Sequence, residues 1–260
     1  MQIALYQCPP LPLDKPANLR RLQQQAALAS AAGAGLLVCP EMFLTGYNIG
    51  AAAVTELAEA ADGPSMQQAA AIAREHGIAL LYGYPERGAD GRVYNSAQLL
   101  DRDGQARLNY RKTHLFGELD RGLFSAGGDD FPVVELDGWK LGVLICYDLE
   151  FPENCRRLAL TGAQAIIVPT ANMLPFGFVA EVTVRSRAFE NHCYVAYANY
   201  CGQEDGIEYC GLSSVAGPLG DLPGLAGDAE QLLIATLDSR ALGMARRFND
   251  YLLDRRQELY

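Results

Sequence analysis

Histidine is scarce in this chain, and its three copies, His76, His114 and His192, are not paired at metal-ligand spacing. No two cysteines have the CxxC spacing of a zinc site either, so a zinc hydrolase is not expected. A GxxxxGK[ST] phosphate loop is also missing. Gly33-Ala34-Gly35 precedes a strand instead of opening a helix, which excludes it as a dinucleotide-binding turn. The sequence therefore predicts no metal and no cofactor.

The chain also lacks long apolar runs and an excess of positive charge. No hydrophobic run approaches the roughly 18 residues of a membrane span. With 21 basic and 31 acidic residues the net charge is −10, which disfavours binding to nucleic acid or to anionic lipid. The chain opens directly on a strand-like segment, without a charged and then apolar leader. We expect a cytoplasmic protein with no membrane or nucleic-acid partner.

Seven cysteines, an odd number at irregular spacing, do not form a disulfide framework. Four of them, Cys8, Cys39, Cys155 and Cys193, lie in or beside apolar runs and are interpreted as reduced core thiols. This usage is typical of a reducing compartment. Half of the residues are hydrophobic and 20% are charged, as in ordinary globular proteins.

Short apolar strands alternate with amphipathic helical stretches along the whole chain. Hairpin signals at residues 102–105 and 137–138 add antiparallel pairs to the crossings expected between parallel strands. No Pro/Ser-rich linker divides the sequence, so we predict a single domain over residues 1–260, with a C-terminal tail from about 240. The pattern alone supports an α/β fold with mixed sheets.

Three chemically distinct side chains follow predicted strands. Glu41 comes after an apolar strand that ends at Pro40, Lys112 ends the strand of residues 106–110, and Cys146 ends the strand of residues 140–145. Taken singly, each has a structural explanation as a surface charge or a core thiol. Together they favour a site, because α/β folds build sites at the carboxyl ends of their strands. Cys146 also directly precedes a predicted helix, whose N-terminus stabilises a thiolate or an oxyanion.

These residues lie in segments that resemble the three signatures of the nitrilase superfamily of carbon–nitrogen hydrolases. The segments are Pro-Glu-Met at 40–42, Tyr-Arg-Lys-Thr-His-Leu at 110–115 and Ile-Cys-Tyr-Asp-Leu-Glu-Phe-Pro-Glu at 145–153. The resemblance extends from Ile3 to about Leu237. It is closest to bacterial aliphatic amidases, in particular those that hydrolyse 5-aminopentanamide. It implies a four-layer αββα sandwich with two mixed sheets, and a homodimer or higher homo-oligomer.

The resemblance also implies a role for each catalytic side chain. Cys146 is the expected nucleophile, and Glu41 the group that accepts and returns its proton. Lys112 and the backbone N–H of Tyr147 are expected to stabilise the oxyanion. Glu118 matches the family's second glutamate, which holds the lysine in place, although a structural salt bridge explains it equally well. A papain-like pair of Cys146 with His114 is the alternative arrangement within the same segments.

The expected substrate is a short linear primary amide, with 5-aminopentanamide as a specific possibility, and the products are a carboxylic acid and ammonia. Its pocket is predicted to include Tyr47, Phe116, Asn172 and Met173. A substrate ammonium would need an acceptor, for which we choose Glu208 in the acidic run 204–208, helped by cation–π contact with Tyr200 or Tyr209. A solvated loop is the simpler interpretation of that run.

Three alternative functions remain open at this point. An N-carbamoyl amino acid amidase would need a basic residue near the site, and Arg185 and Arg187 are candidates. A nitrilase would use the same four catalytic residues. A catalytically inactive binding module on the same fold is the alternative from another class, and ammonia release from any amide would exclude it.

The catalytic assignment predicts how the protein responds to chelators and to alkylating agents. EDTA should leave activity unchanged, because no metal takes part in the expected chemistry. Iodoacetamide should inactivate the protein by alkylating Cys146, and a substrate amide should protect against it. Time courses of ammonia release after each treatment measure both effects. Inactivation by EDTA would show that a metal is required.

Overall fold

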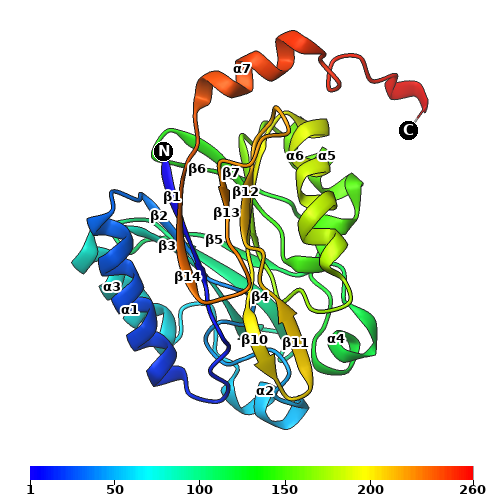
Figure 1. Ribbon diagram of the computed structural model, residues 1–260. Helices are drawn as coiled ribbons and strands as arrows, with labels where there is room; N and C mark the ends of the chain where they lie inside the picture. The colour runs from blue at the N-terminus through cyan, green and yellow to red at the C-terminus, as the bar shows by residue number, and fades with distance from the viewer. Residues whose placement is uncertain (260) are drawn as a thin grey trace.

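The computed structural model describes residues 1–259 and contains two six-stranded sheets packed face to face between helices (Figure 1). The first sheet has the order β14-β1-β2-β3-β4-β5, and the second has the order β13-β12-β9-β8-β7-β6. In each sheet three adjacent strands are parallel, β1-β2-β3 and β7-β8-β9, and the remaining neighbours are antiparallel. The predicted α/β sandwich with two mixed sheets is confirmed.

Strands and helices alternate along much of the chain. The strands are β1 Gln2–Gln7, β2 Leu36–Val38, β3 Ala79–Arg87, β4 Val93–Leu100, β5 Ala106–Arg111, β6 Val133–Leu136, β7 Trp139–Val143, β8 Ala165–Pro169, β9 Tyr194–Ala198, β10 Cys201–Glu204, β11 Ile207–Cys210, β12 Ser214–Ala216, β13 Gly224–Leu225 and β14 Gln231–Thr236. The helices are α1 Lys15–Ala31, α2 Ala51–Leu57, α3 Pro64–His76, α4 Gly117–Leu123, α5 Pro152–Leu160, α6 Val184–Asn191 and α7 Ser239–Phe248, with shorter helical turns η1 Cys146–Glu150, η2 Val179–Thr183 and η3 Gln257–Leu259.

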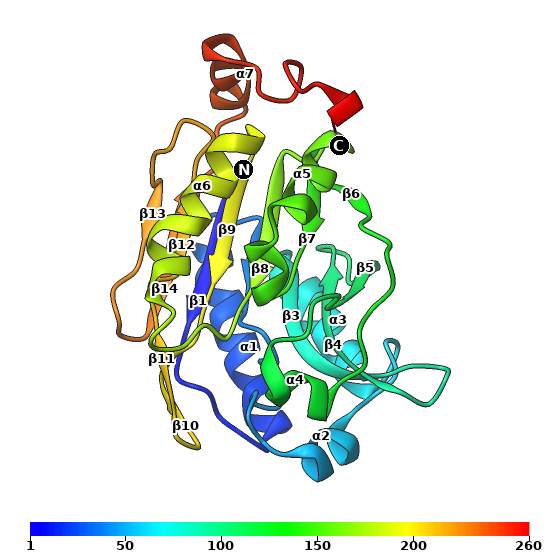
Figure 2. The ribbon, with the colours of Figure 1, turned by 90° about the vertical axis from the view of Figure 1, so that its right-hand side faces the viewer.

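Alternate side chains of strand β1 contribute to two different hydrophobic cores. Ile3 and Leu5 face the other sheet and join the core between the two sheets, which also contains Val143 and Ile167. The alternate residues of β1 face helices α1 and α3 and join a second core. Because successive side chains of a strand point to opposite faces, one strand contributes to both cores. Figures 1 and 2 show α1 and α3 on the outer face of the first sheet and α5 and α6 on that of the second.

Helix boundaries follow local capping chemistry. The Asp14 side chain accepts a hydrogen bond from the Ala17 N–H at 2.9 Å and caps α1. Pro64 and Pro152 occupy the first positions of α3 and α5, where a missing N–H costs no hydrogen bond. Helix α3 ends at Gly77, which adopts the left-handed conformation with φ 61°.

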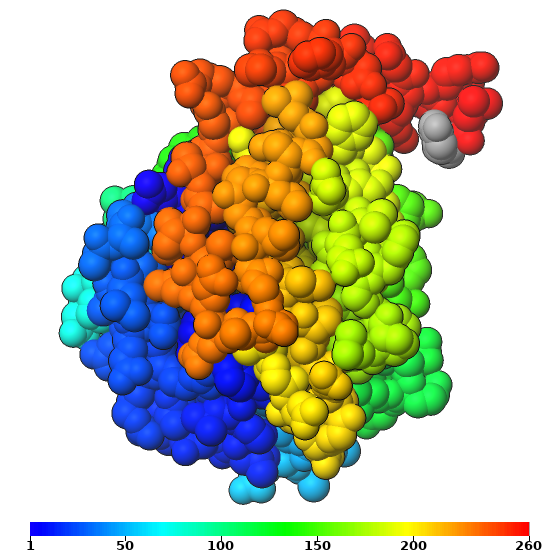
Figure 3. Space-filling view, in the orientation of Figure 1, coloured from blue at the N-terminus to red at the C-terminus, as the bar shows by residue number. Residues whose placement is uncertain are grey.

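Within the tail predicted from about 240, Ser239–Phe248 form helix α7, which projects above the sandwich in Figure 3. Two other regions differ from the sequence-based expectation. The acidic run 204–208 is a β10–β11 hairpin instead of a simple solvated loop. Short helices α2 and α4 replace stretches for which no helix was predicted, since seven-residue segments are too short for a periodic signal. No helix among residues 1–259 is long and apolar enough to span a membrane.

Gly83, in the middle of β3, lets the backbone of Glu41 and Met42 pass very close to that strand. A Cβ at this position would lie 2.2 Å from the Met42 nitrogen and 2.8 Å from Glu41 backbone atoms. The Leu44 N–H also donates to the Gly83 carbonyl at 3.1 Å, so the turn after β2 lies directly on β3. A glycine inside a strand is typical of such contacts.

Replacement of Gly83 by alanine should therefore destabilise the fold by about 1–3 kcal/mol, because backbone atoms must move to admit the methyl group. Thermal or urea unfolding measures the change. Gly122→Ala is the matched control, since its Cβ would meet nothing within 4 Å and alanine favours the helix. Equal stability of the two variants would contradict the close contact.

Candidate active site

The three strand-end residues predicted from the sequence lie together at one edge of the sandwich. Glu41 follows β2 and Lys112 follows β5 of the first sheet, whereas Cys146 follows β7 of the second. The Lys112 Nζ donates to Glu41 Oε1 at 2.7 Å, and the charges of both residues act on the Cys146 thiol. The site therefore forms where the carboxyl ends of strands from the two sheets meet.

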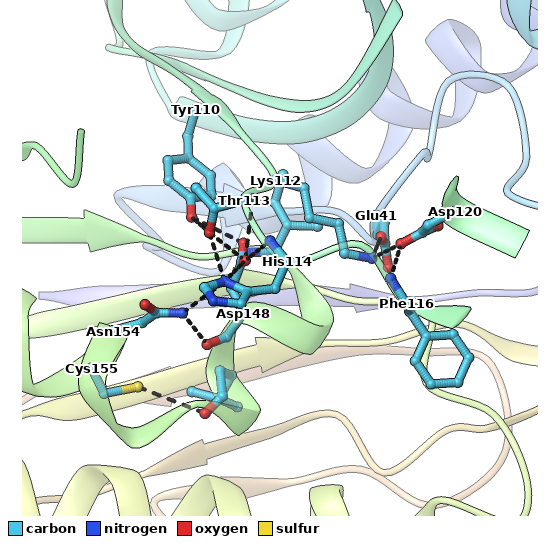
Figure 4. Close-up of polar contacts among 12 residues, drawn as sticks. Glu41, Tyr110, Lys112, Thr113, His114, Phe116, Asp120, Asp148, Asn154 and Cys155 are labelled. Carbon is cyan, nitrogen blue, oxygen red and sulfur yellow. Dashed lines mark hydrogen bonds and ion pairs between the residues drawn. The ribbon is translucent and has the colours of Figure 1, made fainter. Parts of the chain in front are cut away.

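Lys112 is the centre of this cluster and is completely buried. Its ammonium donates to Glu41 and, at 2.6 Å, to Asp120 Oδ2 (Figure 4). Burial lowers the pKa of Lys112, but the negative charges around it, Glu41 first, outweigh burial and raise it. Lys112 is thus a permanently charged donor in a site of low dielectric.

Glu41 is equally buried, and its two oxygens differ in their contacts. Oε1 accepts from Lys112 and from the Asn95 side chain, each at 2.7 Å. Oε2 has no hydrogen-bond partner within residues 1–259. Burial raises the pKa of Glu41, the ammonium of Lys112 opposes this, and the charge of Asp120 adds to the rise. One carboxylate oxygen is therefore held in place while the other is free to accept a proton.

The carboxylate that holds Lys112 on its other side is Asp120, and the prediction of Glu118 for this position is wrong. Glu118 is on the surface, with 93% of its side chain exposed, and pairs with Arg121. The two acids are two residues apart in α4, so they project from different faces of the helix. Asp120 shares the inner face with Phe124, four residues on and buried. That apolar neighbour is the signal that could have identified it.

Further hydrogen bonds fix Asp120 in this position. Its Oδ1 accepts from the Tyr47 hydroxyl at 2.8 Å, and its Oδ2 accepts from the Phe116 N–H at 2.8 Å. The Lys112 ammonium also lies 5.8 Å from the centre of the Tyr47 ring. Tyr47 and Phe116, which were predicted to bind substrate, therefore also support the lysine's counter-ion.

Cys146 is partly exposed, whereas the other six cysteines are buried and all seven are free thiols. Its backbone has φ 47°, a conformation that non-glycine residues rarely adopt and that is typical of strained functional positions. Burial, followed by the charge of Glu41, raises the thiol pKa, and Lys112 and hydrogen bonds from Thr170 and Ala171 lower it. The resting sulfur is a neutral thiol that requires a base.

Asp148 ties the turn of Cys146 to the segment that carries Lys112 (Figure 4). Its carboxylate accepts from the Ile145 N–H at 3.1 Å and from the Tyr110 hydroxyl at 2.9 Å. It also accepts from the N–H and hydroxyl of Thr113 and from the N–H of His114. One buried carboxylate thus orients the nucleophile and the lysine segment at the same time.

His114 belongs to this network and does not form the papain-like pair with Cys146. Its Nδ1 lies 3.1 Å from Asp148 Oδ1 and 2.8 Å from the Thr113 hydroxyl. Its ring stacks on Phe151 with centroids 4.1 Å apart.

Tyr147, whose N–H was predicted to contact an oxyanion, follows Cys146 in the first turn of η1, where N–H groups have no intrahelical partner.

A small, narrow pocket opens beside Cys146. Its walls are aromatic on two sides, where Phe116 contacts Phe176 and Tyr147 edge to face at 5.5 and 5.3 Å. Four of the predicted pocket residues line it, together with three that were not predicted, Glu150, Ala171 and Phe176. The lining residues are Tyr47, Phe116, Cys146, Glu150, Ala171, Asn172, Met173 and Phe176.

Glu208, predicted to accept a substrate ammonium, lies outside this pocket, and its side chain is exposed on β11. Side chains alternate along a strand, so the neighbouring Tyr209 points inward and Glu208 outward. The buried acid of the hairpin is Glu204, which accepts from the N–H groups of Tyr47 and Asn48 and from the Tyr209 hydroxyl. The hairpin therefore positions the Tyr47 loop.

The two arginines considered for an N-carbamoyl substrate are engaged elsewhere. Arg185 donates to the Gly220 carbonyl at 2.8 Å. Arg187 donates to the carbonyls of Leu149 and Glu150 at 3.0 and 2.7 Å and pairs with Glu190. Neither arginine lines the pocket.

Within residues 1–259, no three His, Cys, Asp or Glu side chains are grouped so that they could hold a metal ion.

Comparison with known proteins places this geometry in context. The family described as carbon-nitrogen hydrolase matches residues 2–247. A Pseudomonas protegens protein named "Hydrolase in pqqF 5'region" is 65% identical over 260 residues, which cover 100% of this chain and 90% of that protein. An (R)-stereoselective amidase of a Pseudomonas species is 39% identical over 98% of this chain and 92% of its own length.

Solved structures of an amidase from Nesterenkonia sp. AN1 have the same fold. The NitN amidase superposes with a TM-score of 0.89 at 36% identity, covering 100% of this chain and 98% of that chain. In a glutamate-to-glutamine variant of that amidase, with a TM-score of 0.86, 36% identity and the same coverage, acrylamide has added to the active-site cysteine.

The position of Asp120 generates a pH-dependent prediction. Asp120→Asn removes a charge that helps to raise the Glu41 pKa, so that pKa should fall. If Glu41 must be ionised for activity, the acidic limb of kcat/KM should move to lower pH. The turnover number should fall roughly 10- to 100-fold, because Lys112 is held less well.

Ammonia release from butyramide between pH 5 and 9 measures both effects. Glu118→Gln is the matched control and should behave as the unmodified protein, because its carboxylate is on the surface. A shifted profile in Glu118→Gln, with none in Asp120→Asn, would return the second acid to Glu118.

Proposed function

Because the chain belongs to the carbon–nitrogen hydrolase family and has the fold of nitrilase-superfamily amidases, we propose that it hydrolyses short linear primary amides through a cysteine thioester. The observation that carries the proposal is the Glu41–Lys112 pair, whose charges act on the partly exposed Cys146, with one Glu41 oxygen left without a hydrogen bond from residues 1–259. A base and a fixed positive charge act on a nucleophile that lines a small pocket.

The first half of the reaction forms the thioester. Glu41 Oε2 accepts the Cys146 proton as the sulfur attacks the amide carbon. The negative charge that develops on the carbonyl oxygen is stabilised by the Lys112 ammonium and the Tyr147 N–H, and a donor of this kind contributes about 3 kcal/mol. The C–N bond then breaks, and Glu41 returns the proton to the departing nitrogen, which leaves as ammonia.

The second half releases the acid. Glu41 accepts a proton from water, the resulting hydroxide adds to the thioester carbon, and the carbon–sulfur bond breaks. The proton returns to the sulfur, and the carboxylic acid is released. The same carboxylate is therefore base and acid in both halves, as its free oxygen permits.

Burial and the Lys112 charge both act on the proton transfer from Cys146 to Glu41. For free side chains the difference in pKa between thiol and carboxyl costs about 6 kcal/mol. Burial raises the pKa of Glu41, and the Lys112 charge lowers the thiol pKa at the moment the thiolate forms. The rise in the Glu41 pKa and the attraction of the Lys112 charge for the thiolate lower the energy of the step, whereas burial of the thiol opposes it.

The shape and chemistry of the pocket support a slender acyl group. The pocket is narrow, and its lining is mainly aromatic and aliphatic, with Phe116, Met173 and Phe176 beside the nucleophile. The substrate 5-aminopentanamide is supported by a closer resemblance to amidases that hydrolyse it. The segments that carry this resemblance are residues 39–50, 110–120 and 168–173. The engagement of Arg185 and Arg187 in structural contacts makes an N-carbamoyl amino acid a weaker candidate.

We also propose that the enzyme is cytoplasmic and forms a homodimer or larger homo-oligomer. Seven free thiols support a reducing compartment. Exposed Leu160 of α5 and Phe189 of α6 support an interface on the outer helices, which would cover them.

A substrate panel with a nucleophile variant tests the proposal. Butyramide and 5-aminopentanamide should release ammonia faster than N-carbamoyl-β-alanine or valeronitrile. Cys146→Ala should abolish turnover and retain the fold, because it removes the nucleophile and little volume. Cys155→Ala, which alters a core thiol away from the pocket, should remain active. Turnover by Cys146→Ala would exclude the thioester route, and preference for the nitrile would identify a nitrilase.

A further inference from the structure

Glu150 is the charged side chain among the eight that line the pocket, and the catalytic steps do not use it. It is the last residue of the η1 turn, and the nucleophile Cys146 is the first. The backbone of this turn therefore sets the distance between the two residues. The side chain is half-buried. Its carboxylate makes no hydrogen bond or ion pair with any residue from 1 to 259.

The nearby cations are committed to other partners. Lys112 donates to Glu41 and Asp120, and Arg187 donates to backbone carbonyls and pairs with Glu190. Their charges reach Glu150 only through space. Burial raises the pKa of the Glu150 carboxyl, and the Lys112 and Arg187 charges oppose that rise. The carboxylate therefore carries a desolvation cost that a bound cation would relieve.

The other walls suit a cation on a hydrocarbon chain. Phe116 and Phe176 present aromatic rings, which attract an ammonium and also pack against methylene groups. Met173 and Ala171 add apolar surface, and Asn172 turns its side-chain N–H towards the Phe176 carbonyl. A mainly apolar pocket with one acidic group disfavours a substrate carboxylate and favours a substrate ammonium.

We propose that Glu150 determines substrate choice by binding a positively charged group at the far end of the acyl chain, so that the preferred substrates are linear ω-amino amides. This inference rests on the proposed amidase function and specifies its substrate class. It replaces the exposed Glu208 with a carboxylate inside the pocket. No bond to Glu150 forms or breaks, so it is a specificity residue and not a catalytic one.

The test compares an ω-amino amide with its neutral isostere. Hexanamide differs from 5-aminopentanamide by a methyl group in place of the ammonium. In the unmodified enzyme, kcat/KM for 5-aminopentanamide should exceed that for hexanamide about 10- to 100-fold, the range of a charge-assisted hydrogen bond. Glu150→Gln should bring the ratio of these two kcat/KM values close to one.

Controls separate Glu150 from general effects of charge. Glu153→Gln alters an exposed acid three residues on and should leave the preference unchanged. In the Cys146→Ala background, Glu150→Gln should weaken binding of 5-aminopentanamide in calorimetry and leave hexanamide binding unchanged. A shortened series, 4-aminobutanamide and 3-aminopropanamide, should show a progressively smaller preference, because the backbone of η1 fixes the position of the acid.

Each outcome has a distinct meaning. If the unmodified enzyme hydrolyses butyramide but treats 5-aminopentanamide and hexanamide alike, the cation site is refuted and the amidase stands. If Glu208→Gln removes the preference and Glu150→Gln does not, the acceptor is on the hairpin. If no amide on the panel is hydrolysed, the proposed function itself fails.

Discussion

The site depends on one buried ammonium between two carboxylates. Lys112 has no exposed surface, so its charge is stable only because Glu41 and Asp120 lie 2.7 and 2.6 Å from it. This requirement brings together the ends of β2 and β5 and the inner face of α4. The cluster carries one more negative than positive charge when all three groups are ionised. The excess negative charge raises the pKa of Glu41 and makes its carboxylate a stronger base.

The second sheet joins this cluster through Asp148. The nucleophile lies on a turn with positive φ, a conformation that costs free energy and must be held by its surroundings. The Asp148 carboxylate holds it by accepting N–H groups from both the Cys146 turn and the segment after Lys112. The position of the sulfur relative to the lysine is therefore set by hydrogen bonds across the two sheets, and not only by the core between them.

Strand patterns and chain order indicated an α/β fold with mixed sheets and the strand-end positions of Glu41, Lys112 and Cys146, whereas the four-layer sandwich was implied by the resemblance to the nitrilase superfamily. The residues chosen for the second acid and for the ammonium acceptor, Glu118 and Glu208, are both exposed, because their placement depends on which face of a short element points inward. Glu118 and Asp120 are two residues apart in a helix of seven residues, and Glu208 is next to the inward-facing Tyr209. Such short elements show too little periodicity to assign faces from sequence.

The carboxylates around the site differ in how many of their oxygens accept hydrogen bonds from the protein. This difference separates structural roles from chemical ones. Asp120, Asp148 and Glu204 accept hydrogen bonds that fix α4, the Cys146 turn and the Tyr47 loop. Glu41 is held by one oxygen and has the other free. Glu150 alone faces the pocket without a partner among residues 1–259. A carboxylate that the protein fully engages positions its neighbours, whereas one left partly or wholly unengaged is available to a proton or to a ligand. On this argument the chemistry belongs to Glu41 and the choice of substrate to Glu150.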